Sequence, residues 1–196
     1  MRNPDFDNRF SFSGRIARIK KAPTAYHVTI SQNVAGMMPT EYCLVVPDKA
    51  LTEEGFLFSE GESVFIQDAT LYQKGSELRL RICRQSQMRL CADEFVLNSL
   101  SFSGQITENK EEKNCRMIKL KQTVDGRFET TLNVLVAKSV EATLKPGEIG
   151  YIKSALLYEK DGAYRARIER SSQYSLLFSP DIVMELQRTE AKERFA

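Results

Sequence analysis

The chain has 196 residues, of which 42% are hydrophobic and 28% charged, with a net charge of +2 at neutral pH. This is the composition of a globular protein, and no apolar run approaches the roughly 18 residues that a membrane-spanning helix needs. The small net charge argues against binding nucleic acid by bulk positive charge, so any such binding must depend on local grooves and fall with salt.

The N-terminus and the cysteines point to a reducing compartment. Residues 1–7 have no apolar core of a signal peptide, so we expect a cytoplasmic protein. The cysteines form no Cys-x-x-Cys pair and have no histidine cluster nearby: they are Cys43, Cys83, Cys91 and Cys115. We expect them to be free thiols, and we expect neither a metal nor another cofactor.

The chain carries an internal duplication. Residues 61–87 align with residues 147–173 without a gap, and 13 of the 27 aligned pairs are identical, where composition alone gives roughly one or two. A second anchor, Ser11-Phe-Ser-Gly14 against Ser101-Phe-Ser-Gly104, begins both copies. The offset between the copies is 90 residues at this anchor and 86 at residues 61–87, so four residues have been lost between the two. Because the copies arose by duplication, they should share one fold.

Period-two alternation and turn residues predict five strands in each copy. In the first copy they are 10–20, 25–32, 40–46, 63–73 and 78–85. In the second copy they are 100–107, 115–123, 127–136, 149–159 and 163–171. Asp125-Gly126 and Asp161-Gly162 are strong hairpin signals, and an irregular or briefly helical connection should separate the third strand from the fourth.

A helix is expected at the C-terminus, and a short join between the copies. Residues 88–99 follow the last strand of the first copy without a clear pattern. After the second copy, Ser179 as N-cap, Pro180 at the first helical position and Asp181 in the first turn predict a helix.

A three-stranded meander, a connection and a two-stranded hairpin form the strand order of an OB-fold barrel. Over both copies the chain resembles single-stranded DNA-binding proteins that carry two OB-folds in one chain. The resemblance implies a mainly all-β chain with two tandem five-stranded OB-fold-like barrels and a C-terminal α-helix. The expected domains are a first OB-fold at 1–90, a linker at 91–99, a second OB-fold at 100–178 and the helix at 179–196. That helix either forms a homo-oligomer or packs on its own barrel.

Cations and aromatic rings recur at matched positions, as binding of a single strand requires. The last strand of each copy alternates, so period two puts both arginines outwards and the apolar residues inwards. The candidate nucleic-acid-binding residues are Tyr72, Lys74, Arg79 and Arg81, their counterparts Tyr158, Lys160, Arg165 and Arg167, the matched aromatics Phe65 and Tyr151, and the basic residues Arg15, Arg18, Lys119 and Lys121. The structural alternative is that these arginines are merely solvated, that Tyr–Arg pairs stabilise a hairpin and that Phe65 and Tyr151 fill the core.

Catalysis is not indicated. The single histidine, His27, has no counterpart in the second copy, and there is no phosphate-binding loop or nucleophile elbow. We therefore predict a largely sequence-independent single-stranded DNA-binding protein, not an enzyme, that acts in replication, recombination or the DNA metabolism of a mobile element or phage. Two alternatives stay open: an OB-fold interaction subunit or adaptor of a larger complex, and RNA binding, which uses the same stacking.

Overall fold

The computed structural model describes residues 7–33, 39–75, 77–93, 95–124, 128–142 and 144–179. Within these ranges the chain is mostly β-strand with three short 3-10 helices, which confirms the predicted mainly β class. The C-terminal helix is expected at 179–196, and all of it beyond Ser179 lies outside the described residues. No helix in the described ranges is long and apolar enough to cross a membrane.

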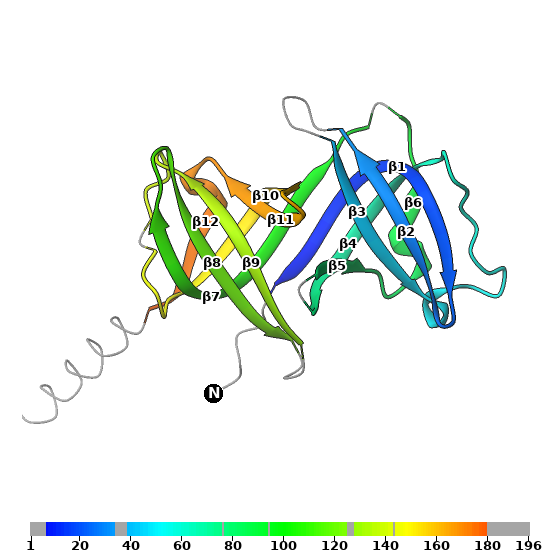
Figure 1. Cartoon of the computed structure of the whole chain (residues 1–196), viewed down its shortest axis with the longest axis horizontal. Helices are drawn as coiled ribbons and strands as arrows, with labels where there is room; N and C mark the ends of the chain where they lie inside the picture. Colours follow the sequence, from blue (N-terminus) through cyan, green and yellow to red (C-terminus); the bar gives the residue numbers. More distant parts are fainter. Residues whose placement is uncertain are drawn as a thin grey trace, which may run out of the picture.

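The first half of the chain closes into a five-stranded ring, called ring one (Figure 1). Its strands are β1 (Asn8–Ala22), β2 (Ala25–Gln32), β3 (Thr40–Pro47), β4 (Ser63–Lys74) and β5 (Glu77–Arg81). They pair in the order β1-β2-β3-β5-β4, and β4 closes the ring by pairing with β1. The pair β3–β5 is parallel and the other pairs are antiparallel.

The second half repeats this arrangement as ring two. Its strands are β7 (Asn98–Glu111), β8 (Cys115–Val124), β9 (Phe128–Ala137), β10 (Ile149–Lys160) and β11 (Ala163–Ile168). Their order is β7-β8-β9-β11-β10, closed by β10–β7, with β9–β11 parallel. All five strands predicted for each copy are therefore present.

Two short strands and two of the three 3-10 helices were not predicted, whereas the third lies in the connection expected to be irregular or briefly helical. β6 (Met88–Leu90) lies at the start of the expected join and pairs with β4, and β12 (Tyr174–Phe178) pairs with β10. The helix η1 (Asp48–Ala50) follows β3. The helices η2 (Gln85–Gln87) and η3 (Ser171–Gln173) occupy the residues predicted to end the last strand of each copy.

A bulge in the fourth strand of each ring explains why the last strands end early. Asp68 and Ser154, which match in the two copies, adopt the left-handed conformation with φ of 51°. At these places β4 and β10 shift register against β1 and β7. The Gln87 side chain donates to the carbonyl of Asp68 at 2.9 Å, and Gln173 donates to the carbonyl of Ser154 at 2.6 Å. The chain after β5 and β11 thus turns back to bind the bulge, because its exposed carbonyls need donors.

The rings are related by a pseudo-two-fold axis. Their first strands pair antiparallel, with Asn8 opposite Phe102 and Phe12 opposite Asn98. Because the copies are offset by 90 residues here, exchanging them converts one of these pairs into the other. In Figure 1 a half-turn in the plane of the page brings ring two onto ring one, and the axis passes between them.

A buried polar network around this axis binds the rings to each other. The Asn8 side-chain amide donates to the Leu71 carbonyl at 2.7 Å and to Gln122 Oε1 at 2.9 Å, and its oxygen accepts from the Leu71 N–H at 2.8 Å. Asn98, the counterpart of Asn8, makes the same three bonds to the equivalent leucine and glutamine, each at 2.8 Å. Leaving such a buried group unpaired costs about 1–3 kcal/mol, so the network holds the rings in one orientation.

Candidate nucleic-acid interface

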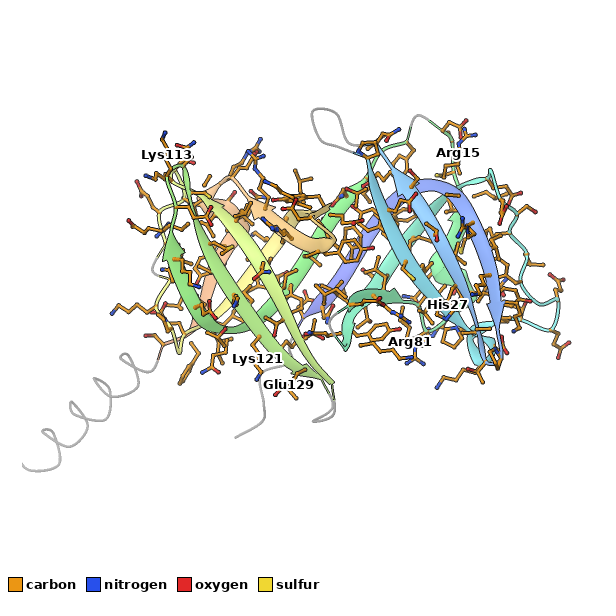
Figure 2. The ribbon with its side chains drawn as sticks, in the orientation of Figure 1. Arg15, His27, Arg81, Lys113, Lys121 and Glu129 are labelled. Carbon is orange, nitrogen blue, oxygen red and sulfur yellow. The ribbon has the colours of Figure 1, made fainter. Side chains whose placement is uncertain are left out.

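The outward side chains of ring one form a surface that we call face one. Leu80, which lies between Arg79 and Arg81, and Ile82, which follows them, are fully buried. The predicted alternation of outward arginines and inward apolar residues therefore holds. The pairing registers align the outward residues in two rows that cross the strands. The first row is Tyr72, Arg79, Cys43, Thr29 and Arg18, and the second is Thr70, Arg81, Val45, His27 and Lys20. Figure 2 shows His27 and Arg81 on the same side of the ring.

Ring two presents the equivalent surface, face two. Its first row is Tyr158, Arg165, Asn133, Lys119 and Glu108, and its second row is Leu156, Arg167, Leu135, Met117 and Lys110. In both rings the tyrosine is the direct cross-strand partner of the first arginine, at identical register. The structure therefore brings together the tyrosine and arginine candidates of each copy, together with Arg18 on face one and Lys119 on face two.

The strand cations of face two are neutralised by neighbouring carboxylates. The ion pairs are Arg165–Asp161 at 3.4 Å, Arg167–Glu169 at 2.7 Å, Lys119–Glu108 at 2.7 Å and Lys121–Glu129 at 2.9 Å. Lys121 lies one outward position from Lys119 along β8. Only Lys160, exposed at the β10–β11 turn, has no ion pair among the candidates that the structure describes on this face. The positive field of face two is therefore weak.

Face one keeps most of its cations free. Arg79 pairs with Glu77 at 2.6 Å. Arg18, Arg81 and the exposed Lys74 form no ion pair with any residue that the structure describes. The Nε atom of Arg81 is buried without a hydrogen-bond partner, which is rare for a buried donor. Face one is thus the more strongly positive surface.

The aromatic and histidine side chains on the faces are in their neutral forms near neutral pH. Burial raises the pKa of Tyr72 and of Tyr158, against the opposing effect of the neighbouring arginines, so each phenol keeps its proton. His27 has its pKa lowered from the usual 6.5, first by burial and then by the positive charges of Arg79, Lys74 and Lys20. Each face therefore offers a flat neutral ring beside an arginine, the combination on which bases stack.

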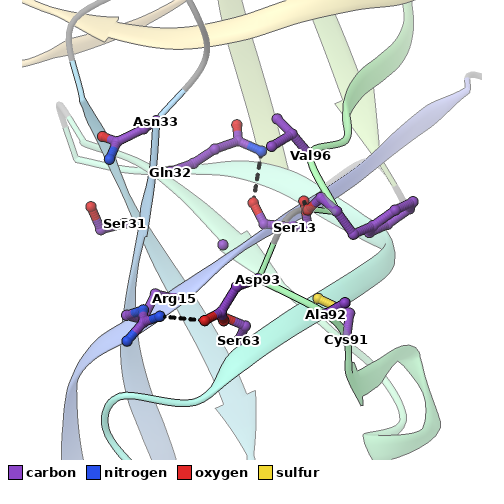
Figure 3. A pocket seen from close by; sticks show the side chains of 12 residues that line it. Ser13, Arg15, Ser31, Gln32, Asn33, Ser63, Cys91, Ala92, Asp93 and Val96 are labelled. Atoms are coloured by element: carbon purple, nitrogen blue, oxygen red, sulfur yellow. Dashed lines mark hydrogen bonds and ion pairs between the residues drawn. The ribbon is translucent and has the colours of Figure 1, made fainter.

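Lys74, Lys160 and Lys121 lie next to the rows, at the turns or along β8, whereas three other candidates lie away from both faces. The Phe65 ring packs edge-on against Phe95 with centroids 5.8 Å apart, on the part of β4 that pairs with β1 and β6. The Tyr151 hydroxyl donates to Asp7 at 3.2 Å. Arg15 forms an ion pair with Asp93 at 2.8 Å beside a small pocket of ring one (Figure 3), and Figure 2 shows it at the opposite end of that ring from Arg81.

Some residues at the site were not among the predicted nucleic-acid-binding candidates. Lys20 and His27 lie in the second row of face one because β1, β2 and β3 pair in a register that period two alone does not specify. Tyr164 has no aromatic counterpart, since Leu78 occupies the matched position, so the comparison of the copies could not reveal it. Among the described residues, no group of three or more histidine, cysteine or acidic side chains could hold a metal ion.

Comparison with known proteins shows the fold. No protein-family model matches the chain, and no curated protein matches it by sequence. The wild-type single-stranded DNA-binding protein from Thermus aquaticus has a similar structure, with a TM-score of 0.62, 15% identity, and coverage of 89% of this chain and 94% of that one. A deletion mutant of the same protein gives a TM-score of 0.63 at 13% identity, covering 89% and 96%. At this identity the likeness shows that the chain has the fold of these OB-fold proteins.

Proposed function

We propose that the chain is a single-stranded DNA-binding protein built from two tandem OB-folds, and that the strand lies across faces one and two. The observation that carries the proposal is the repeated pairing of a tyrosine with an arginine at identical register on both faces. Stacking of a base on such a ring contributes about 1–3 kcal/mol and tolerates any base. These pairs lie next to the turn between the fourth and fifth strands, and their rows continue across the third and second strands. The surface of the second and third strands and the loop between the fourth and fifth are parts of an OB-fold that hold oligonucleotides.

The pseudo-two-fold axis supports one continuous path for the strand. β5 and β11, which carry the arginines, adjoin each other between the rings. A strand can therefore pass along Arg81 and Arg79, cross the axis and continue along Arg165 and Arg167. Arg79 matches Arg165 and Arg81 matches Arg167, so this path meets the equivalent arginines of the two faces in opposite order. The DNA strand would therefore lie on the two faces with opposite 5′ to 3′ polarity. We propose that this is why the faces differ in charge, with face one as the stronger phosphate-binding surface.

Fluorescence anisotropy with labelled oligo-dT, duplex DNA of equal length and oligo-U tests the function. We expect tight binding to oligo-dT, weaker binding to duplex, and a fall in affinity as salt rises. The R79S/R81S variant should lose most of this affinity and R165S/R167S a smaller part. The control K49S/R89S makes the same charge change away from the faces and should bind normally.

Three results would overturn the proposal or redirect it. Absence of binding to oligo-dT at low salt would contradict DNA binding and favour the adaptor alternative. Stronger binding to oligo-U than to oligo-dT would replace DNA by RNA as the ligand. Equal losses in the control and in the face variants would show that binding is a bulk-charge effect and does not depend on these faces.

A further inference from the structure

A pocket of about 310 Å³ lies between the rings and takes its lining from both. Ring one contributes Cys43, Glu77, Leu78 and Arg79, and ring two contributes Glu159, Gly162, Ala163 and Tyr164. The volume is at the lower end of the roughly 300–1,000 Å³ of small-ligand sites. The pocket therefore has room for a group of the size of one nucleobase.

The alignment of the copies places this pocket on the pseudo-two-fold axis. Glu77 and Leu78 match Ala163 and Tyr164, so equivalent positions of both copies line the same space. Arg79, which belongs to face one, also lines it. A strand that crosses from face one to face two must pass this point, so this inference depends on the proposed function.

The chemistry of the lining favours a base over a phosphate. Arg79 is already paired with Glu77, whereas the Glu159 carboxylate has no hydrogen-bond or ion-pair partner among the described residues. A phosphate would meet net negative charge here. An exocyclic amine of a base would instead donate to the carboxylate, as cytosine N4 does to glutamate.

Tyr164 supplies an aromatic wall with a fixed orientation. Its hydroxyl donates to the Glu41 carbonyl at 2.6 Å and accepts from the Cys43 N–H at 3.1 Å. Its ring stacks on the buried Tyr42 with centroids 5.7 Å apart. Burial raises the pKa of Tyr164, so the ring stays neutral. The pocket thus combines a rigid aromatic surface with one free carboxylate.

We propose that this junction pocket holds one base of the crossing strand, and that Glu159 selects bases with an exocyclic amine. Cytosine has an amine at position 4, where uracil has a carbonyl. Comparing these two bases therefore tests the contact between the exocyclic amine and Glu159 alone. The protein should therefore bind oligo-dC more tightly than oligo-dU, by about fivefold for one good contact. The faces themselves remain tolerant of sequence, and the preference comes from this single position.

Anisotropy titrations with labelled oligo-dC and oligo-dU at pH 8, where cytosine is unprotonated, test the proposal. The ratio of the two affinities should fall to about one in Glu159→Met and take an intermediate value in Glu159→Gln, because a charged acceptor is roughly twice as strong as a neutral one. Glu53→Met, which removes an exposed carboxylate from the β3–β4 connection, should keep the wild-type ratio. Thermal unfolding of each variant checks that it is folded.

The possible outcomes distinguish a failure of the pocket proposal from a failure of the proposed function. Equal affinity of the wild-type protein for the two oligonucleotides would overturn the role of the pocket while leaving strand binding intact. A ratio that survives in Glu159→Met would also overturn it, since another group would then read the base. Failure of both oligonucleotides to bind at low salt would instead contradict the proposed function itself.

Discussion

One part of the difference in charge between the faces can be traced to one matched pair of residues. On face two Glu169 pairs with Arg167 at 2.7 Å, and both side chains are about half exposed. On face one the position of Glu169 is occupied by Cys83, an exposed free thiol, so Arg81 has no carboxylate there. Cys83→Glu should therefore install the ion pair of face two on face one, and Glu169→Ser should release Arg167.

The size of the effect follows from the exposure of the pair. An exposed ion pair is worth up to about 1 kcal/mol, and a phosphate that binds the arginine must replace it. Cys83→Glu should thus weaken binding of oligo-dT by up to about fivefold, and Glu169→Ser should strengthen it by a similar factor. Complete removal of the contact in Arg81→Ser costs more, about 1.5 kcal/mol or roughly tenfold, because no pair is released in exchange.

Anisotropy at several salt concentrations measures both the affinity and the number of phosphate contacts. The slope of log K against log salt should shrink by about 0.7 in Arg81→Ser, the value for one contact with a single strand. Leu57→Glu adds the same charge as Cys83→Glu at an exposed position of the β3–β4 connection, and it should change affinity little. If Leu57→Glu and Cys83→Glu weaken binding equally, the local ion pair is irrelevant. If Arg81→Ser leaves the salt slope unchanged, Arg81 does not contact phosphate.

Three further outcomes follow from individual side chains. The pKa of His27 is lowered in the free protein, where three cations lie nearby, and a bound phosphate should raise it. The complex then takes up a proton, so affinity should increase as pH falls from the pKa of His27 in the complex towards its pKa in the free protein. His27→Gln should remove this pH dependence. Asn8→Ala should lower the free energy of unfolding by about 3 kcal/mol in urea titrations, since it leaves three buried groups unpaired, whereas Asn114→Ala on an exposed turn should have no effect. Gly104→Ala should cost about 1–3 kcal/mol in the same assay, because its Cβ would lie 2.7 Å from the carbonyl oxygen of Lys121; an unchanged urea midpoint would contradict either stability argument.

Local patterns in the sequence were sufficient for the strands and for the direction of the arginines. Period-two alternation placed Arg79 and Arg81 outwards with Leu80 between them, and burial of Leu80 agrees. The hairpin signals placed the turns, and the duplication allowed each strand to be read twice. These features depend on neighbours a few residues apart, which is the range over which periodicity and turn chemistry act. The short strands β6 and β12 carry too few residues to show a period.

Contacts across the ring could not be derived in this way. Arg81 lies beside Val45 in the parallel pair β3–β5, and Val45 lies beside His27 in the pair β2–β3. A shift of one residue in either register would turn different side chains outwards. The neutralisation of face two by Glu169 and its neighbours likewise depends on where side chains meet in space. Arg15, Phe65 and Tyr151 had the right residue types but the fold placed them elsewhere.

The sequence by itself determined that the two halves of the chain are copies, which residues form their strands and which arginines point outwards. These features are repeated local patterns. The relation between the copies was decided only by tertiary structure. The pairing of β1 with β7, the pseudo-two-fold axis, and the pocket that both Tyr164 and Arg79 line depend on residues some 80 or more positions apart. A duplication requires the copies to be alike, but their orientation follows from which buried polar groups satisfy each other across the junction.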